Sequence, residues 1–121
     1  MMQISRTIIV LDAAELGPVS SFWSQLVGGT VEADDDDWHT VFVDSQPWMG
    51  VQLAPNHIRP QWPDGTPQQI HLDLYIKDLA AAHEETMDLG ATLLQEADDP
   101  AADEGFQVYA DPAGHPFCLC W

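Results

Sequence analysis

Basic residues are almost absent from this sequence. Three lysines and arginines stand against 20 aspartates and glutamates, which gives a formal net charge of −17 at pH 7. A surface this acidic repels phosphate backbones and anionic lipid headgroups, so we expect neither nucleic-acid nor membrane partners. It favours a cationic ligand, although acidity also serves solubility and adaptation to high salt. The run 34–37 of four aspartates is interpreted as a solvated loop, because consecutive carboxylates do not converge on one ion.

Cysteines and long apolar runs are also scarce. The two cysteines, Cys118 and Cys120, are two residues apart, which excludes a disulfide framework and a multi-cysteine zinc site. No stretch approaches the roughly 18 apolar residues that span a bilayer, and no basic segment with an apolar run opens the chain. We therefore expect a soluble, cytoplasmic protein.

The chain contains enough apolar residues to form one hydrophobic core. It contains 121 residues, of which 45% are hydrophobic, and a chain of this length typically forms one domain. We expect a single domain over 1–121, with one module at about 4–54, a proline-rich connector at 55–67 and a second module at about 68–121.

Each module repeats the same order of elements. Apolar spacing predicts a strand, a helix and three more strands, twice over. The predicted strands are 7–11, 30–32, 40–43, 48–54, 70–76, 91–95, 106–110 and 116–121, and the helices start at Leu16 and Leu79. Glu15-Leu16 matches Asp78-Leu79 at an offset of 63, which indicates a duplicated module rather than a solenoid. Each helix covers one face of a curved mixed sheet, so the other faces can enclose a cavity.

Four short motifs resemble the vicinal oxygen chelate superfamily, the glyoxalase and bleomycin-resistance fold. They are Ser21-Phe22-Trp23, His71-Leu72-Asp73-Leu74, Asp78-Leu79 and the run 111–119. The resemblance covers nearly the whole chain. It implies an α+β fold of two tandem βαβββ modules that form curved mixed sheets around a cavity, and it implies a homodimer. The superfamily includes isomerases, dioxygenases, epimerases, thiol transferases and drug-sequestering proteins, so it leaves the activity open.

The resemblance also implies where a metal would bind. Metal-dependent members take one ligand from the first and fourth strand of each module, and here these positions fall on Ile8, Gln52, His71 and Cys118. Ile8 offers no donor atom. We therefore predict no metal cofactor; a divalent ion, if one binds, would use His71, Gln52 and Cys118.

Strand alternation selects the residues that line the cavity. The predicted ligand-binding side chains are Trp38, Phe42, Trp48, Gln52, His71, Tyr75 and Cys118. His71 and Asp73 share one face of a strand and can couple as a general acid–base pair, although ordinary strand neighbours pair without catalysis. Trp62 and Arg59, in the connector, can form a lid or a dimer contact.

Two classes of function follow from this set. The first is a glyoxalase-like protein that binds a small aromatic or cationic organic molecule without a metal, either sequestering or sensing it. The alternative is a metal-dependent lyase, isomerase or dioxygenase of the superfamily. A metal-free enzyme that uses His71 and Asp73 for proton transfer is a third interpretation.

Overall fold

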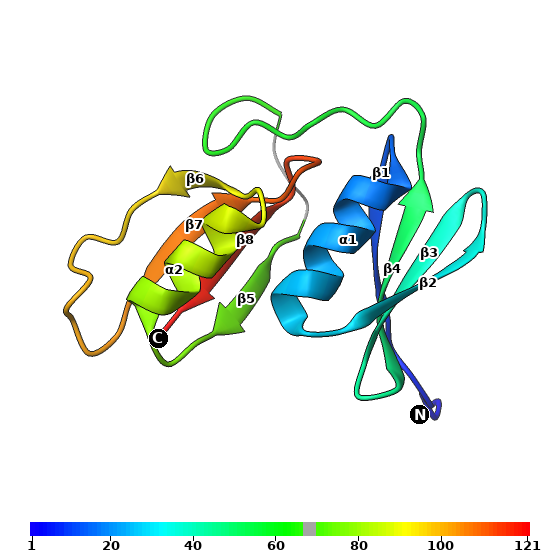
Figure 1. Cartoon of the computed structure of the whole chain (residues 1–121), viewed down its shortest axis with the longest axis horizontal. Coiled ribbons are helices and arrows are strands. Elements are labelled where there is room, and N and C mark those ends of the chain that lie inside the picture. The colour runs from blue at the N-terminus through cyan, green and yellow to red at the C-terminus, as the bar shows by residue number, and fades with distance from the viewer. Residues whose placement is uncertain (67–69) are drawn as a thin grey trace. The chain divides into compact units, whose positions relative to one another are not determined.

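The computed structural model describes residues 1–66 and 70–121 and divides into two compact units, Met1–His57 and Ile58–Trp121. Pro67, the last residue of the predicted connector, lies outside the described residues. Each unit contains a helix and a four-stranded mixed sheet in the chain order strand, helix, strand, strand, strand (Figure 1). The predicted α+β class and its two tandem modules are confirmed. The prediction that both modules make one domain stays a prediction.

The first unit is built on a sheet of order β1-β4-β3-β2, in which β1 runs parallel to β4 and the other pairs are antiparallel. Its elements are β1 (Ile9–Ala13), α1 (Leu16–Val27), β2 (Thr30–Asp35), β3 (Trp38–Val43) and β4 (Gln46–Leu53). The helix ends at Gly28, whose φ of 70° lies in the left-handed region that glycine adopts without strain.

Alternate residues of β3 and β4 point inward and form the core of this unit. Val41, Met49 and Val51 are at most 1% exposed, and they belong to strands whose alternate residues turn away. The helix contributes Phe22 and Trp23, whose rings meet edge to face with centroids 5.4 Å apart. The apolar spacing that predicted the helix therefore marks its buried side.

The second unit repeats the plan with shorter elements. They are β5 (Leu72–Tyr75), α2 (Leu79–Asp88), β6 (Thr92–Gln95), β7 (Phe106–Ala110) and β8 (Pro116–Cys120), in the sheet order β5-β8-β7-β6. Strand β5 runs parallel to β8. The helix starts at Asp78, whose carboxylate accepts the backbone N–H of Ala81 at 3.1 Å as an N-cap.

Buried polar groups fix this unit internally. Tyr109 is fully buried and stacks on Phe117, and its hydroxyl meets Nδ1 of His83 and the amide of Gln107, both at 2.8 Å. In the β7–β8 hairpin, Asp111 is 1% exposed and accepts the backbone N–H of His115 at 2.8 Å while its second oxygen meets the His115 ring at 2.6 Å. These bonds satisfy groups that would be costly to bury alone.

Two local predictions need correction. The acidic run is only half loop: Asp34 and Asp35 belong to β2, and Asp36 and Asp37 form the turn. The ring of Trp48 lies 6.2 Å from that of Trp23 in α1, so its predicted place on the face opposite the helix is not found. The sheet register shifts between Val41 and Phe42, opposite this part of β4, and a bulge there breaks the strict alternation on which the prediction depended.

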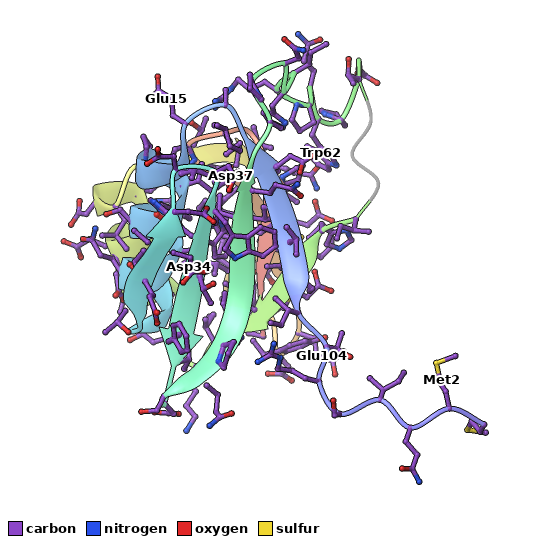
Figure 2. All side chains as sticks on the ribbon, turned by 90° about the vertical axis from the view of Figure 1, so that its right-hand side faces the viewer. Met2, Glu15, Asp34, Asp37, Trp62 and Glu104 are labelled. Atoms are coloured by element: carbon purple, nitrogen blue, oxygen red, sulfur yellow. The ribbon has the colours of Figure 1, made fainter. Side chains whose placement is uncertain are left out.

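Many acidic side chains lie at the surface. Glu15, Asp34, Asp37 and Glu104 are all exposed, and Figure 2 labels them on the ribbon. Among the described residues, no helix combines the length and apolarity needed to cross a membrane.

Candidate functional site

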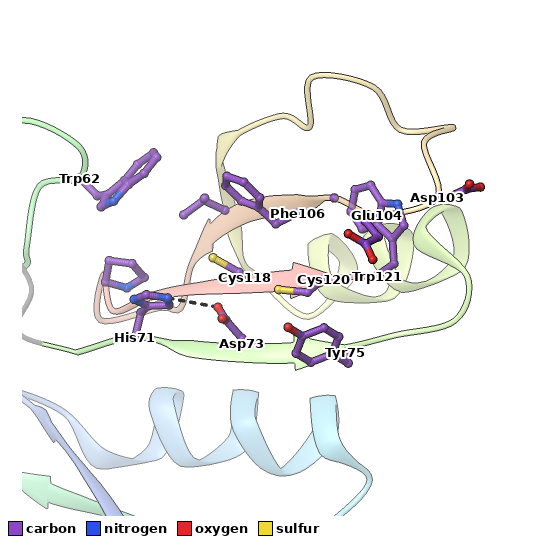
Figure 3. Close-up of a pocket in the computed structure, with 13 residues that line it drawn as sticks. Trp62, His71, Asp73, Tyr75, Asp103, Glu104, Phe106, Cys118, Cys120 and Trp121 are labelled. Carbon is purple, nitrogen blue, oxygen red and sulfur yellow. Dashed lines mark ion pairs between the residues drawn. The ribbon is translucent and has the colours of Figure 1, made fainter.

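A pocket of about 920 Å³ opens within the second unit (Figure 3). Residues from β5, β7 and β8, the connector and the loop before β7 all contribute to it. The lining consists of Trp62, His71, Asp73, Tyr75, Asp103, Glu104, Gly105, Phe106, Val108, Pro116, Cys118, Cys120 and Trp121. This volume suits a small organic molecule.

The floor of the pocket is the sheet face that α2 does not cover. In β8, Phe117 and Leu119 are at most 1% exposed on the core side, while Cys118 and Cys120 alternate with them and line the pocket. In β5, Asp73 and Tyr75 lie on the same face as the cysteines, and the parallel register pairs them with Cys118 and Cys120 respectively. The predicted alternation of both strands is therefore found.

Asp73 lies at the centre of the polar part of this floor. Its Oδ1 is 3.1 Å from Nε2 of His71, and both side chains are nearly half exposed, so solvent screens the pair. Burial, reinforced by the Asp73 charge, raises the pKa of the Cys118 thiol to about 12. Burial and the same carboxylate also raise the pKa of Cys120. Both cysteines are therefore neutral thiols at pH 7, which are poor nucleophiles.

This arrangement differs from that of a cysteine hydrolase. Such enzymes need a histidine next to the thiol to remove its proton, with an acid behind the histidine. Here the carboxylate of Asp73 interacts both with His71 and with the thiol of Cys118. The raised pKa of the thiol therefore argues against Cys118 as a thiolate nucleophile.

Aromatic rings form the walls. Tyr75 is 80% exposed and Phe106 is 50% exposed, although both are large apolar side chains next to a pocket. Trp62 packs against the cluster of Val108 with the two cysteines. Figure 3 shows Trp62 at one end of the pocket and Trp121 at the other. Exposed rings around a hollow provide flat apolar surface for a ligand.

A hydrogen bond, together with the space left by the missing side chain of a glycine, fixes Trp121 at one end of the pocket. The indole N–H donates to the carbonyl of Ala102 at 3.0 Å, and the backbone of Trp121 pairs with that of Gly105 in both directions. A Cβ on Gly105 would lie 2.6 Å from the indole ring. Glycine is therefore required where the ring covers the strand.

The charges in the lining are all acidic. Asp73 lies on the floor, while Asp103 and Glu104 come from the loop before β7, and none of the lining residues is lysine or arginine. Arg59 of the connector donates instead to the carbonyl of Pro112 in the hairpin turn. Because His71 is the only basic side chain among the described lining residues and pairs with Asp73 alone, the acidic groups together favour a cation in the pocket.

The structure divides the predicted site residues between the two units. His71, Asp73, Tyr75 and Cys118 lie together in the pocket, and the connector residue Trp62 joins them. The other four predicted residues, Trp38, Phe42, Trp48 and Gln52, belong to β3 and β4 of the first unit.

Within the first unit, Trp38 is held in a defined position. Its indole N–H donates to the hydroxyl of Thr40 at 3.0 Å, and that hydroxyl donates to Asp34 at 3.0 Å. The ring lies over Gly50, where a Cβ would come within 2.5 Å of it. Phe42 borders a separate hollow at the end of α1, next to Gly28 and Gly29.

Several lining residues were not predicted. Phe106 shares its pocket side with Val108, so alternation along β7 would have found it. Asp103, Glu104 and Trp121 carried no such signal, because their positions depend on the path of the loop at 96–105 and on the end of β8.

The metal positions that the resemblance implies include one residue that cannot bind a metal. Ile8 has no donor atom, and it lies just before β1. The sheet register further shows that Gln52 pairs with Asp12, which corresponds to Tyr75 at the offset of 63. Since Tyr75 pairs with Cys120, Gln52 corresponds to Cys120 and not to Cys118.

A different group of donors lies in the second unit. One ligand atom each from His71, Asp73 and Cys118 lie within 4.8 Å of one another. Imidazole, carboxylate and thiolate are all zinc ligands, so this group fits a metal that the four-position set does not.

The fold and the order of its elements define a class of protein, the tandem βαβββ proteins. A family model described as "Glyoxalase-like domain" matches residues 8–120, and the chain belongs to this family, within the vicinal oxygen chelate superfamily. A comparison with curated proteins finds no match.

Solved structures with the same fold share little sequence with this chain. The genomically encoded fosfomycin resistance protein FosX from Listeria monocytogenes is 13% identical with a TM-score of 0.73, over 98% of this chain and 93% of that one. A glyoxalase/bleomycin resistance protein/dioxygenase family enzyme from Burkholderia phytofirmans PsJN is 13% identical with a TM-score of 0.69, over 93% and 94%. A glyoxalase-related enzyme from Fulvimarina pelagi is 18% identical with a TM-score of 0.69, over 97% and 88%. These likenesses show the fold alone.

Proposed function

We propose that this glyoxalase-like protein binds a small aromatic or cationic organic molecule in the pocket of its second unit, without the metal of its superfamily. The observation that carries the proposal is that the described lining has four side chains of tryptophan, tyrosine or phenylalanine and three acidic groups, and neither lysine nor arginine. Rings stack on flat ligands, and carboxylates next to them favour a positive charge.

The relatives support a binding role without fixing the ligand. The Listeria protein is a fosfomycin resistance protein by its printed name, and the Burkholderia protein belongs to a family named partly for bleomycin resistance. Proteins of this fold thus include resistance proteins. We propose that the present chain likewise sequesters or senses a small molecule, as a homodimer in the cytoplasm.

A screen by thermal shift tests the proposal. Cationic aromatic compounds should raise the Tm, neutral aromatics less, and anionic aromatics of similar size least, because the lining is acidic. Phe106→Ala should weaken binding by at least about tenfold, or 1.4 kcal/mol, since it removes an exposed ring from the wall. Met87→Ala is the matched control, because Met87 is a similarly exposed apolar residue on α2.

Two results would overturn the proposal. One is the absence of any shift across a broad library of cationic and aromatic compounds. The other is equal weakening by the Phe106 and Met87 substitutions, which would place binding outside the pocket.

A metal-dependent lyase, isomerase or dioxygenase is the second candidate, favoured by the three converging donors His71, Asp73 and Cys118. Those residues would hold the ion, and the ion would supply a Lewis acid for a substrate with adjacent oxygens. Metal analysis of protein purified without a metal-affinity tag decides between the two. Stoichiometric zinc, manganese, nickel or iron that is lost in His71→Ala would establish the second candidate over the first.

A further inference from the structure

The pocket has two ends of different chemistry, and the register of its strands separates them. Asp73 lies opposite Cys118 toward one end, next to His71, and this end carries the polar groups of the floor. Two residues further along β5 and β8, Tyr75 lies opposite Cys120. Side chains at i and i+2 of a strand lie roughly 7 Å apart on the same face. The floor therefore changes from polar to aromatic within the length of a small organic molecule.

At the aromatic end, two exposed rings flank a small side chain. Strand β8 lies between β5 and β7, and Cys120 is paired with Tyr75 on one side and with Phe106 on the other. All three side chains line the pocket, so they share one face of the sheet. The two outer strands are about 9–10 Å apart, at two strand spacings. Because the thiol between the rings is short, it leaves a hollow bordered by aromatic surface.

A third ring borders this hollow at the end of β8. The backbone of Trp121 pairs with that of Gly105, and the indole ring lies over that glycine, where a Cβ would come within 2.6 Å of it. Glu104 directly precedes Gly105 and also lines the pocket. Figure 3 shows Tyr75, Trp121 and Glu104 toward this end of the pocket and Trp62 toward the other. Rings thus supply the walls, and a carboxylate supplies negative charge at the rim.

We infer that the rings of Tyr75, Phe106 and Trp121 form an aromatic cage, and that the ligand is a small molecule with an alkylated ammonium group. This inference rests on the proposed function and narrows its class of ligand. An alkylated ammonium group presents an apolar surface with a diffuse charge, which the faces of aromatic rings attract. The exposed carboxylate of Glu104 adds attraction at longer range.

A primary ammonium group suits this end of the pocket less well. It has three N–H donors, each of which needs an acceptor when it leaves water. The faces of the rings are poor acceptors, and the thiol of Cys120 is neutral at pH 7 because burial raises its pKa. The cage should therefore prefer an ammonium group whose hydrogens are replaced by methyl groups.

Three probes of similar length test the inference by proton NMR titration of the full-length protein. Choline carries a trimethylammonium group, 3,3-dimethylbutan-1-ol has the same shape with carbon in place of nitrogen, and ethanolamine carries a primary ammonium group. Choline should bind at least about fivefold more tightly than either of the others, which corresponds to about 1 kcal/mol for a cation over aromatic faces. Ring currents should move its methyl signal upfield on binding.

Phosphocholine distinguishes a free small molecule from a lipid headgroup with the same ammonium group. Its phosphate is repelled by the carboxylates of Asp103 and Glu104, so it should bind more weakly than choline. Tighter binding of phosphocholine would indicate a lipid headgroup and would overturn the inference of a free small molecule.

Tyr75→Leu separates an aromatic cage from a merely apolar wall. Tyr75 is 80% exposed on β5, so the substitution should leave the fold intact. It removes a ring face but keeps an apolar side chain. The affinity for choline should therefore fall by at least about threefold, and that for the neutral alcohol should change less than about twofold. Phe106→Leu should act in the same way, whereas Trp62→Leu, at the other end of the pocket, is the matched control and should change the affinity for choline less than about twofold.

Equal affinity for choline and either of its two analogues would overturn the inference. An equal fall in affinity for choline and the neutral alcohol in Tyr75→Leu would overturn it as well. In both cases the proposed function stands if cationic aromatic compounds still bind and Phe106→Ala weakens them. If neither these probes nor any compound of the library binds, the inference and the proposed function are both wrong.

Discussion

Asp73 is the residue on which the polar half of the pocket depends. Its carboxylate pairs with the ring of His71 and also faces the buried thiols of Cys118 and Cys120. Burial, reinforced by its charge, holds the protons on the cysteines, and its oxygen lies 3.1 Å from the imidazole ring of His71. One substitution at this position should therefore change the chemistry of three side chains.

Alkylation of Cys118 measures the effect of Asp73 on the thiol. Because the pKa of Cys118 is raised from 9.0 to about 12, the thiol keeps its proton throughout the range in which an ordinary thiol ionises. In a Cys120→Ser background, the rate with iodoacetamide should rise about tenfold per pH unit from pH 8 to pH 11. Asp73→Asn should lower the pKa and speed alkylation at pH 8.

A plateau near pH 9 in the Cys120→Ser protein would contradict this prediction. The same raised pKa implies a stability effect with a definite sign. The protonated thiol stabilises the fold fully below about pH 9, and this contribution is lost as the pH rises toward 12.

The pairing of His71 with Asp73 and the inward thiols could be predicted because β5 and β8 are regular strands, where position alone decides the face. For Trp62, the sequence predicted only that it forms a lid or a dimer contact in the connector. Its place next to Val108 and the thiols depends on a turn-rich segment whose path no periodicity encodes.

At the scale of elements, the sequence predicted which segments form helices and strands better than it predicted where the strands begin and end. The two helices and the strand β7 agree with their apolar spacing to within about one residue. Strand β1 begins at Ile9 and not at Thr7, and β5 is shorter than its alternating sequence. Both strands begin after the point where their partners β4 and β8 could still pair with them, and local sequence does not encode where such pairing begins.

The contact between Trp38 and Gly50 ties two strands of the first sheet together. Gly50→Ala places a Cβ 2.5 Å from the indole ring, so the ring must move away from β4. We expect the free energy of unfolding to fall by about 1–3 kcal/mol in urea denaturation. Gly17→Ala is the matched control, because nothing lies within 4 Å of its Cβ in α1 and alanine should stabilise the helix by about 0.5–1 kcal/mol.

If the two glycine substitutions have effects of the same sign, the contact with Trp38 is not what requires glycine at position 50. Tryptophan fluorescence of the folded Gly50→Ala protein provides a second measurement. The indole N–H of Trp38 donates to Thr40, and displacement of the ring should change the emission maximum.

At the scale of the whole molecule, the main feature is the large net negative charge. Twenty acidic residues against three basic ones leave few attractive pairs to offset repulsion among carboxylates, which destabilises the folded state. Asp35 and Asp37 illustrate this locally. The backbone N–H of Asp37 donates to Asp35 at 3.2 Å, and the interaction of the two side chains lowers the pKa of Asp35 and raises that of Asp37.

Salt should therefore stabilise the protein. Raising sodium chloride from about 0.05 to about 0.5 M shortens the screening length to a few ångströms, and we expect the Tm to rise by several degrees. Calorimetry measures the shift, with an uncharged osmolyte at equal osmolarity to isolate screening from exclusion effects. A Tm that is constant or falls with salt would show that repulsion among the acidic groups does not limit stability.

The described residues that line the pocket all belong to the segment Trp62–Trp121. A mutational library can therefore vary the described lining of this pocket within one short gene fragment. The codons for Met1–His57 stay unchanged in such a library. The same holds for recombination among relatives, because a single crossover near residue 58 exchanges one pocket lining for another.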